Sequence, residues 1–389
     1  MAPERLQLEN FAQIRRADLA FGDLTILVGP QATGKSLVLQ LFKLVVDRVR
    51  IVRTIRRYGF DWNRDAGRFF ALYFGGGMDR AWRDGETRLS VRGLEYSPQQ
   101  LASSRGKQKA ERFFLIPAQR VLTLRDGWPR DYMSYGAGDP FVVRQFSEHL
   151  RQLMEAGLGK GAGPIFPQPG RMAAALRRYI AESVFAGAEV RLEMEERDSR
   201  KTVVLQLREE TRLGYMTWSA GQREFFPLLL GLYWLMPSSH VSKKADVEWV
   251  AIEEPEMGLH PEAISAFLLA VLELLRRGYK VIITTHSPQL LELVWAIRIL
   301  RERPDFERSI AQIFAVRRSR FVNELAGVVK TKLLHTFFFK RGGDGLVTTK
   351  DISSLDAAAT DPDVSDWGGL TQFSTRLSDV VAERVAGAA

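Results

Sequence analysis

Apolar and polar residues alternate with different periods along the chain, and each period predicts a different element. Residues 5–23 hold two short alternating segments that predict strands around a turn, and the apolar run LTILVG starting at Leu24 predicts a buried strand. Residues 36–58 carry apolar positions at helical spacing and predict a helix. In the second half of the chain, helical patterns and short apolar strands alternate in the order 221–236, 247–253, 261–277 and 280–285. This alternation predicts a parallel α/β sheet flanked by helices.

Residues 61–214 lack that alternation. Three short segments between residues 66 and 116, RFFALYFGGG, TRLSVRGLEY and RFFLIP, predict an antiparallel sheet arm. Helical stretches at 142–157 and 171–185 follow, and then a hairpin at 188–207 that turns at 198–201. We therefore predict an α/β core with a mixed sheet from residues 1–60 and 215–350, an inserted β arm and helical subdomain from residues 61–214, and a polar C-terminal tail from residues 351–389. The segments SIAQIFAVRR and GLVTTKDI are the predicted last strands of this core.

Composition narrows the class of protein. The chain has 389 residues, of which 46% are hydrophobic and 26% charged, so it can bury a full core. It has no apolar run of membrane-spanning length and no signal peptide at its start, which predicts a cytoplasmic protein without a membrane partner. The absence of cysteine excludes disulfides, thiolate metal sites and cysteine nucleophiles.

The net charge of +9 leaves nucleic-acid contact open. Arginines that could make such contacts, or could equally be solvated surface, are Arg48, Arg50, Arg53, Arg56 and Arg57 in the first helix and Arg317, Arg318 and Arg320 further on.

The most specific motif is a P-loop between the buried strand and the first helix. Its sequence GPQATGKS comprises Gly29, Pro30, Gln31, Ala32, Thr33, Gly34, Lys35 and Ser36. Glycines at both ends let the backbone curl so that its N–H groups and the helix N-terminus face phosphate oxygens. Lys35 is positioned to reach the β and γ phosphates, and Ser36 to bind Mg²⁺. This motif predicts ATP and Mg²⁺ as ligands.

Two further strands end in residues suited to phosphate chemistry. The strand VEWVAIE ends in adjacent carboxylates, of which we assign Glu253 to the magnesium ion and Glu254 to the polarisation of water. The strand KVIITT is followed by His286, which lies where parallel sheets bind ligands and is the predicted γ-phosphate sensor.

The order of P-loop, acidic strand and histidine strand resembles the ABC-type ATPases, most closely their OLD-like and SMC-like branch. In that family a Ser/Gly-rich signature binds the nucleotide of the opposite subunit, and WSAGQRE is similar to it at Ser219, Gly221 and Gln222. The resemblance implies a homodimer that closes around ATP, with EMGLHP at 256–261 as an interface loop and Gln119 as the Q-loop residue and further magnesium contact. Most members carry Asp where this chain has Glu253. A simple helix N-cap is the alternative for Ser219.

OLD-type nucleases carry a TOPRIM domain after the histidine strand. Only 103 residues follow His286, and they must also complete the ATPase sheet, so we predict that this chain has no nuclease domain of its own. Asp361 and Asp363 are formally Asp-x-Asp but are predicted to lie in a loop. We therefore expect a slow, regulatory ATPase, dimeric or of higher order, that controls a separate nuclease-like or toxic effector in antiphage defence. The alternatives are a DNA-binding repair or motor ATPase and, third, a transport ATPase.

Overall fold

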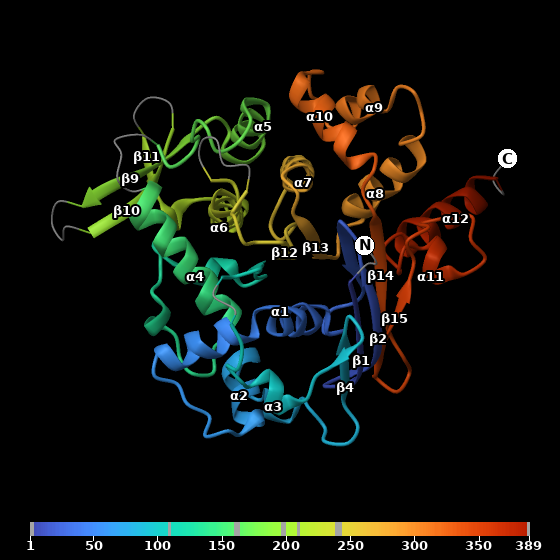
Figure 1. Ribbon diagram of the computed structural model, residues 1–389. Coiled ribbons are helices and arrows are strands. Elements are labelled where there is room, and N and C mark those ends of the chain that lie inside the picture. The colour runs from blue at the N-terminus through green and yellow to red at the C-terminus, as the bar shows by residue number, and fades with distance from the viewer. Residues whose placement is uncertain are drawn as a thin grey trace.

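A ten-stranded mixed sheet forms the centre of the protein (Figure 1). The computed structural model describes residues 4–107, 110–158, 164–195, 200–207, 211–237 and 243–386. The strand order is β5-β4-β1-β2-β15-β14-β3-β13-β12-β6. Strands β14, β3, β13, β12 and β6 are parallel, whereas β2, β1, β4 and β5 form an antiparallel arm. This is the α/β fold of P-loop NTPases with an antiparallel arm, as the sequence predicts.

Helices cover both faces of the parallel part, because successive side chains of a strand point to opposite faces. Val250 and Ile252 of β12 belong to the core beneath α6 and α7, whereas Trp249 and Ala251 belong to the core beneath α1. Figure 1 shows α1 on one side of β12 and β13 and α7 on the other. Burial on both faces explains why these strands are continuously apolar.

The element bounds follow the sequence patterns closely in most places. The strands of the large sheet are β1 (Glu4–Phe11), β2 (Ile14–Phe21), β3 (Leu24–Val28), β4 (Arg88–Val91), β5 (Leu94–Glu95), β6 (Phe113–Ile116), β12 (Trp249–Glu253), β13 (Lys280–Thr285), β14 (Leu334–Arg341) and β15 (Val347–Asp351). The smaller sheets contain β7 (Leu124–Arg125) with β8 (Trp128–Pro129), and β9 (Glu189–Glu195) with β10 (Arg200–Gln206) and β11 (Arg212–Gly214). The helices are α1 (Lys35–Arg57), α2 (Ala66–Phe74), α3 (Pro98–Leu101), α4 (Phe141–Leu153), α5 (Ala174–Phe185), α6 (Ala220–Leu235), α7 (Pro261–Arg276), α8 (Pro288–Leu300), α9 (Phe306–Ile313), α10 (Arg320–Val329), α11 (Pro362–Ser365) and α12 (Gln372–Ala386).

The hairpin predicted at 188–207 is formed by β9 and β10, and residues 196–199 at its turn lie outside the described residues. Among the described residues, no helix combines the length and the apolarity that a bilayer span needs.

Two predicted strands are wrong, and a third lies in a different part of the sheet from the one predicted. RFFALYFGGG forms α2, because Asp65 caps the helix by accepting the N–H of Arg68 at 3.1 Å and the aromatic residues recur at helical spacing. SIAQIFAVRR contributes to α9, and the strand beside β3 is instead β14. RFFLIP does form a strand, β6, but β6 is parallel to β12 and belongs to the parallel core rather than to the arm. GLVTTKDI forms β15, as predicted.

The predicted division into core and insertion stays a prediction. The ten-stranded sheet takes β4, β5 and β6 from within residues 61–214. Strand β6 is fixed by buried charges, because Asp47 of α1 accepts the N–H groups of Arg112 at 2.9 Å and of Phe113 at 3.1 Å. Lys43 lies between Asp47 and Glu111, at 3.3 and 2.9 Å. These contacts attach the start of β6 to α1, and so to the P-loop.

Candidate functional site

The P-loop joins β3 to α1 and is shaped by the strand next to it. Positive φ angles at Gly29 (144°), Ala32 (55°) and Gly34 (87°) bend the loop. A Cβ atom at Gly29 would lie 2.6 Å from the carbonyl oxygen of Phe339, so glycine is required by close backbone approach as well. Arg341, at the end of β14, donates to the carbonyl oxygen of Ala32 at 2.9 Å. Strand β14 therefore supports the loop from outside.

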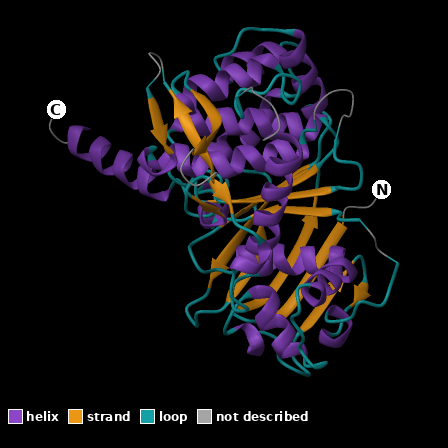
Figure 2. Cartoon of the chain, turned by 90° about the vertical axis from the view of Figure 1, so that its left-hand side faces the viewer, coloured by secondary structure: helices purple, strands orange, loops and turns teal. Residues whose placement is uncertain are grey.

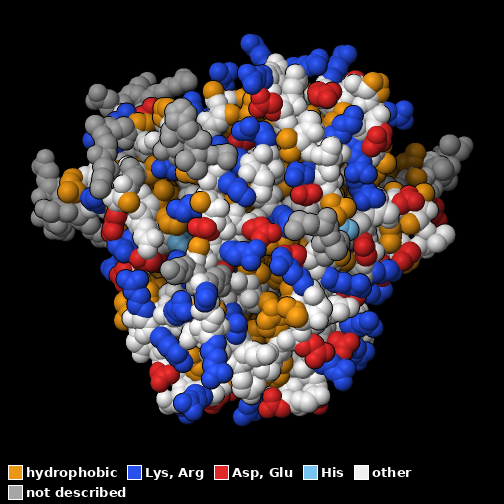
Figure 3. Space-filling model, in the orientation of Figure 1, with side chains coloured by type: hydrophobic (Ala, Val, Ile, Leu, Met, Phe, Trp, Pro, Cys, Tyr) orange, Lys and Arg blue, Asp and Glu red, His pale blue; other side chains and the backbone are white. Residues whose placement is uncertain are grey.

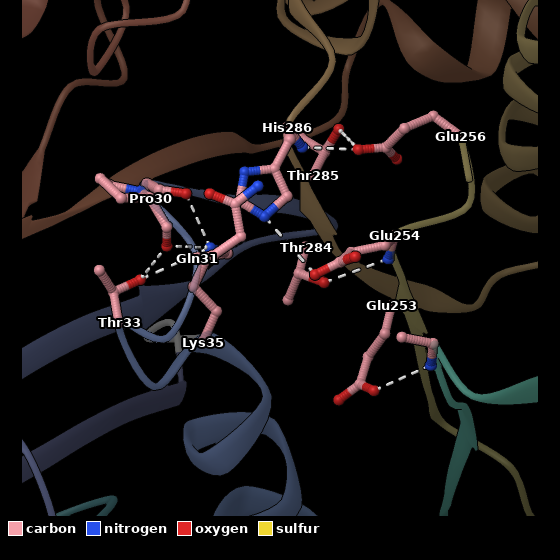
Figure 4. A network of polar contacts seen from close by, with 12 residues as sticks. Pro30, Gln31, Thr33, Lys35, Glu253, Glu254, Glu256, Thr284, Thr285 and His286 are labelled. Atoms are coloured by element: carbon pink, nitrogen blue, oxygen red, sulfur yellow. Dashed lines mark hydrogen bonds and ion pairs between the residues drawn. The ribbon is translucent and has the colours of Figure 1, made fainter. Parts of the chain in front are cut away.

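Lys35 is held inside its own loop (Figure 4). Its Nζ donates to the carbonyl oxygens of Gly29 at 2.7 Å and of Pro30 at 2.8 Å, and Thr33 Oγ1 donates to Pro30 as well. Burial lowers the pKa of Lys35 to about 8, and the carboxylate of Glu254 opposes this shift. The ammonium group is thus held in place, and nearby carboxylates offset only part of the cost of burying its charge. A phosphate bound beside it would offset the rest.

Glu253 is a buried carboxylate with one free oxygen. It is 1% exposed, Oε2 accepts the N–H of Ala118 at 3.0 Å, and the Ser36 side chain is among the groups that lower its pKa. Oε1 has no hydrogen-bond partner among the described residues. Burial raises the pKa of Glu253 to about 7. An unpaired buried carboxylate oxygen beside a serine hydroxyl fits Mg²⁺, which prefers hard oxygen ligands.

Replacement of Glu253 by glutamine should stabilise the protein without nucleotide at pH 8. Because burial raises the pKa of Glu253 from about 4.5 to about 7, ionising this group costs stability as the pH rises between those values, and a neutral amide avoids that cost. We expect Glu253→Gln to raise the free energy of unfolding by about 3 kcal/mol at pH 8 and to leave it almost unchanged at pH 4.5.

Urea unfolding at the two pH values measures this difference. Glu254→Gln is the matched control, because the pKa of Glu254 is lowered and its neutral variant gains no such stability. A Glu253→Gln variant that is less stable than the wild type at pH 8 would contradict this account of the site.

Glu254 and His286 face one another at the ends of neighbouring strands (Figure 4). Oε1 of Glu254 lies 3.5 Å from Nε2 of His286, and this imidazole holds the pKa of Glu254 below its ordinary value. The backbone N–H of His286 donates to Glu256 at 2.6 Å, and Thr285 Oγ1 donates to the same oxygen at 2.8 Å. Glu256 was not among the predicted site residues, and it fixes the histidine turn.

Arg120 is the main residue that the sequence patterns did not identify. Its side chain is fully buried and donates to the carbonyl oxygens of Glu253 at 3.1 Å and of Glu254 at 3.2 Å. Its Nε donates to the carbonyl oxygen of Glu224 in α6 at 3.1 Å, and the Glu224 carboxylate lies 3.3 Å away. Glu254 has a φ of 42°, which is uncommon for a non-glycine residue. Arg120 therefore holds a strained turn and joins it to α6.

The residues predicted to form the signature begin α6. Ser219 and Gln222 form a capping box, in which Ser219 Oγ accepts the Gln222 N–H at 3.3 Å and Gln222 Oε1 accepts the Ser219 N–H at 3.1 Å. A Cβ atom at Gly221 would lie 2.8 Å from the carbonyl oxygen of Gly258, so this turn packs on the loop EMGLHP. Ser219 is exposed, and no hydrogen bond or ion pair within the described chain joins it to the P-loop.

Gln119 is exposed and precedes Arg120 in the segment after β6. Its role as a Q-loop residue stays a prediction, although its neighbour Ala118 contacts Glu253.

The C-terminal tail also approaches the P-loop. A cleft of about 480 Å³ is lined by Gly29, Pro30 and His286 on one side and by residues of 362–372 on the other. Asp363 is held there by Lys340 at 2.8 Å and Lys350 at 2.9 Å, so the predicted loop at Asp361 to Asp363 contains the short helix α11 and its carboxylates form ion pairs with lysine.

Several of the arginines considered for nucleic-acid contact have contacts within the chain. Arg48 of α1 donates to the carbonyl oxygen of Gln100 at 2.7 Å, and Arg53 to that of Gly106 at 3.0 Å. Arg320 pairs with Glu324 at 2.8 Å. Figure 3 shows basic side chains spread over one face of the molecule among acidic ones.

Comparison with known proteins also indicates an ATPase domain. Residues 173–292 match the family model described as "AAA domain, putative AbiEii toxin, Type IV TA system". This stretch runs from α5 into α8 and includes the turn at Ser219 to Gln222, Glu254 and His286. With the P-loop before it, the chain carries a P-loop ATPase domain. No curated protein matches the sequence.

Solved structures of low identity also match. The SMC head domain from Thermotoga maritima has 13% identity and a TM-score of 0.35, and the match covers 90% of this chain and 99% of that one. An SMC head bound to the C-winged helix domain of ScpA has 11% identity and a TM-score of 0.41, covering 90% and 97%. A dimeric bacterial ABC transporter cassette has 12% identity and a TM-score of 0.31, covering 74% and 90%.

Proposed function

We propose that this chain is a cytoplasmic ATPase, slow and regulatory, that dimerises around ATP and controls a separate effector, a nuclease or toxin, in antiphage defence. The observation that carries the proposal is the convergence of Lys35, Ser36, Glu253, Glu254 and His286 at the carboxyl ends of the adjacent strands β3, β13 and β12. Parallel sheets bind ligands at that edge, and these residue types serve phosphoryl transfer.

Each residue has a chemical task in this proposal. Ser36 and Glu253 would hold Mg²⁺, which neutralises phosphate charge when bound. Lys35 transfers its hydrogen bonds from loop carbonyls to phosphate oxygens. Glu254, kept ionised by His286, accepts a proton from the attacking water. His286 then lies beside both the water and the terminal phosphate, and Glu256 keeps its turn in place.

The position of the turn from Ser219 to Gln222, the predicted signature, supports a dimer. The Ser219 end of α6 offers backbone N–H groups and a positive helix end to an anion, yet within the described chain it contacts residues of α5 and the 256–261 loop rather than the P-loop. We infer that its anion is the nucleotide of a second copy. Such a contact is reciprocal in a two-fold dimer, so each site draws residues from both chains.

Mixed variants test this shared site. Lys35→Ala removes phosphate binding from a copy's own site, and Ser219→Arg blocks the site of its partner. Each variant alone should lose hydrolysis, whereas an equal mixture should recover about a quarter of wild-type activity, because half of the dimers are mixed and each holds one complete site.

Ser97→Arg is the matched control, because Ser97 caps α3 with the same kind of capping box. It should lose a similar stability, about 1 kcal/mol, and keep hydrolysis. Two inactive variants that stay inactive after mixing, with both still folded, would contradict the shared site.

A broad cleft on the surface supports the binding of a separate effector protein. It measures about 980 Å³ and lies between the segment after Arg120 and the start of α6. Leu122 and Met216 line it and are 61% and 65% exposed, beside basic residues that include Arg125 and Arg223. Because Arg223 of α6 lines the cleft together with the segment that follows Arg120, movement of α6 would alter the cleft.

A further inference from the structure

Helix α12 extends from the body of the protein and is exposed along its length (Figure 2). All residues from Gln372 to Val385 are exposed, including the apolar residues Phe373 (69%), Leu377 (55%), Val380 (56%), Val381 (54%) and Val385 (67%). Apolar side chains are visible on this helix at the right-hand edge of Figure 3. A 15-residue helix is marginal in water by itself, so this apolar face needs a partner.

The spacing of the exposed residues is that of a short coiled coil. Phe373, Leu377, Val380 and Arg384 follow one another at intervals of four, three and four residues, which places them in one seam. Val381 lies beside the seam. The seam spans two heptads and ends in an arginine, which is an unusual residue for an apolar contact and therefore informative about what lies opposite.

An antiparallel copy of the same helix satisfies every position of the seam. In that arrangement Leu377 lies opposite Val380 of the second copy, and Phe373 lies opposite Arg384 of the second copy. The arginine then packs its stem on the ring and gains a cation–π contact. A parallel arrangement would instead place two Arg384 side chains against each other.

The flanking charges favour the same orientation. Arg376 and Glu383 are seven residues apart, so they lie on one flank of the seam. Antiparallel pairing brings this flank against the same flank of the second copy, which places each Arg376 beside a Glu383. In a parallel pair the flank would face Ser374 and Val381, and both charges would be left without partners.

We propose that α12 pairs with α12 of a second copy in antiparallel orientation, and that this contact forms without nucleotide. Helix α12 begins at Gln372, which lines the cleft that also contains Gly29 and His286, so the pairing brings the C-terminal end of the second copy's helix towards that cleft. Two heptads give a weak contact. Its effect is to raise the effective concentration of one ATPase domain near the other.

The absence of native cysteine allows a direct test. Phe373 and Arg384 are about 16 Å apart along one helix, too far for a short cross-linker to join within a chain. The double variant Phe373→Cys/Arg384→Cys, treated with a short bismaleimide without nucleotide, should give covalent dimers. Each single-cysteine variant should give no covalent dimer, because antiparallel pairing separates the two equal positions. Cross-linking of the single variants would indicate parallel pairing and overturn the proposal, as would the absence of any cross-link.

Charge reversal gives a second test in the uncross-linked protein. Arg376→Glu and Glu383→Arg should each weaken self-association in sedimentation equilibrium, and their mixture should restore it as a mixed dimer. Asp379→Arg, on the side away from the seam, is the matched control and should leave self-association unchanged. All variants are measured in a Lys35→Ala background, so the outcome is independent of ATP binding and of the proposed function.

Discussion

Glu254→Gln is expected to lower the rate of ATP hydrolysis by a factor of about 10² to 10⁴, while ATP affinity changes little. The glutamine keeps the shape of the side chain and loses the ability to accept a proton from water. Its backbone contacts, the N–H to the Thr284 carbonyl at 2.9 Å and the carbonyl to Arg120, are independent of that change. Single-turnover hydrolysis and equilibrium nucleotide binding measure the two effects separately.

The same variant should accumulate as a closed dimer with ATP, which light scattering can detect. Glu262→Gln is the control, because Glu262 is an exposed carboxylate in the first turn of α7. If Glu254→Gln hydrolyses ATP at the wild-type rate, or loses binding as strongly as hydrolysis, the assignment of Glu254 is wrong.

The closed dimer of the Glu254→Gln variant can also be used to capture the effector. A tagged Glu254→Gln protein should retain the effector in ATP and release it in ADP, and Met216→Asp, at the cleft beside α6, should weaken that retention.

The sequence predicts those parts of the site whose residues directly follow an apolar strand in the chain. The P-loop, the carboxylates after β12 and the histidine after β13 each stand directly after an apolar strand, and parallel strands bring their carboxyl ends together. Nothing more than chain order and the strand period is needed to expect that Lys35 and Glu254 meet. SIAQIFAVRR and LHTFFFKR are both short apolar segments, so the apolar pattern alone does not decide which of them is a strand. The structure has the strand at LHTFFFKR and a helix at SIAQI.

The rest depends on contacts between distant residues. Arg120 lies 104 positions from Glu224 and 133 from Glu253, and no local period reveals that its guanidinium reaches both. The same holds for Arg341, which contacts the P-loop from 309 positions away. The pattern of short alternating segments predicts a strand at RFFALYFGGG. A helix forms there because Asp65 caps its start and the aromatic residues bury one face of it.

Replacement of Arg120 should uncouple α6 from the catalytic turn. Arg120→Ala leaves the carbonyl oxygens of Glu253, Glu254 and Glu224 without their donor and the Glu224 carboxylate without its cation, and we expect a loss of about 3–5 kcal/mol in the free energy of unfolding. Arg120→Lys keeps the charge but has a single nitrogen in place of the planar fork, so it cannot bridge both elements. Its stability loss should be smaller, which keeps the variant measurable.

The lysine variant therefore separates positioning from folding. Because the turn at Glu254 has a φ of 42° and relies on Arg120, its relaxation would move the carboxylate away from the attacking water. We expect Arg120→Lys to bind ATP almost normally and to lose hydrolysis at least tenfold, as a small misplacement of a catalytic group suffices for that. Arg125→Lys is the matched control, because Arg125 lies in the same segment and is exposed. If Arg120→Lys loses stability and yet retains the full rate of ATP hydrolysis, Arg120 only fills the core. If the rate of hydrolysis falls while ATP binding is kept, the contact of Arg120 with α6 and with the turn at Glu254 positions the catalytic carboxylate.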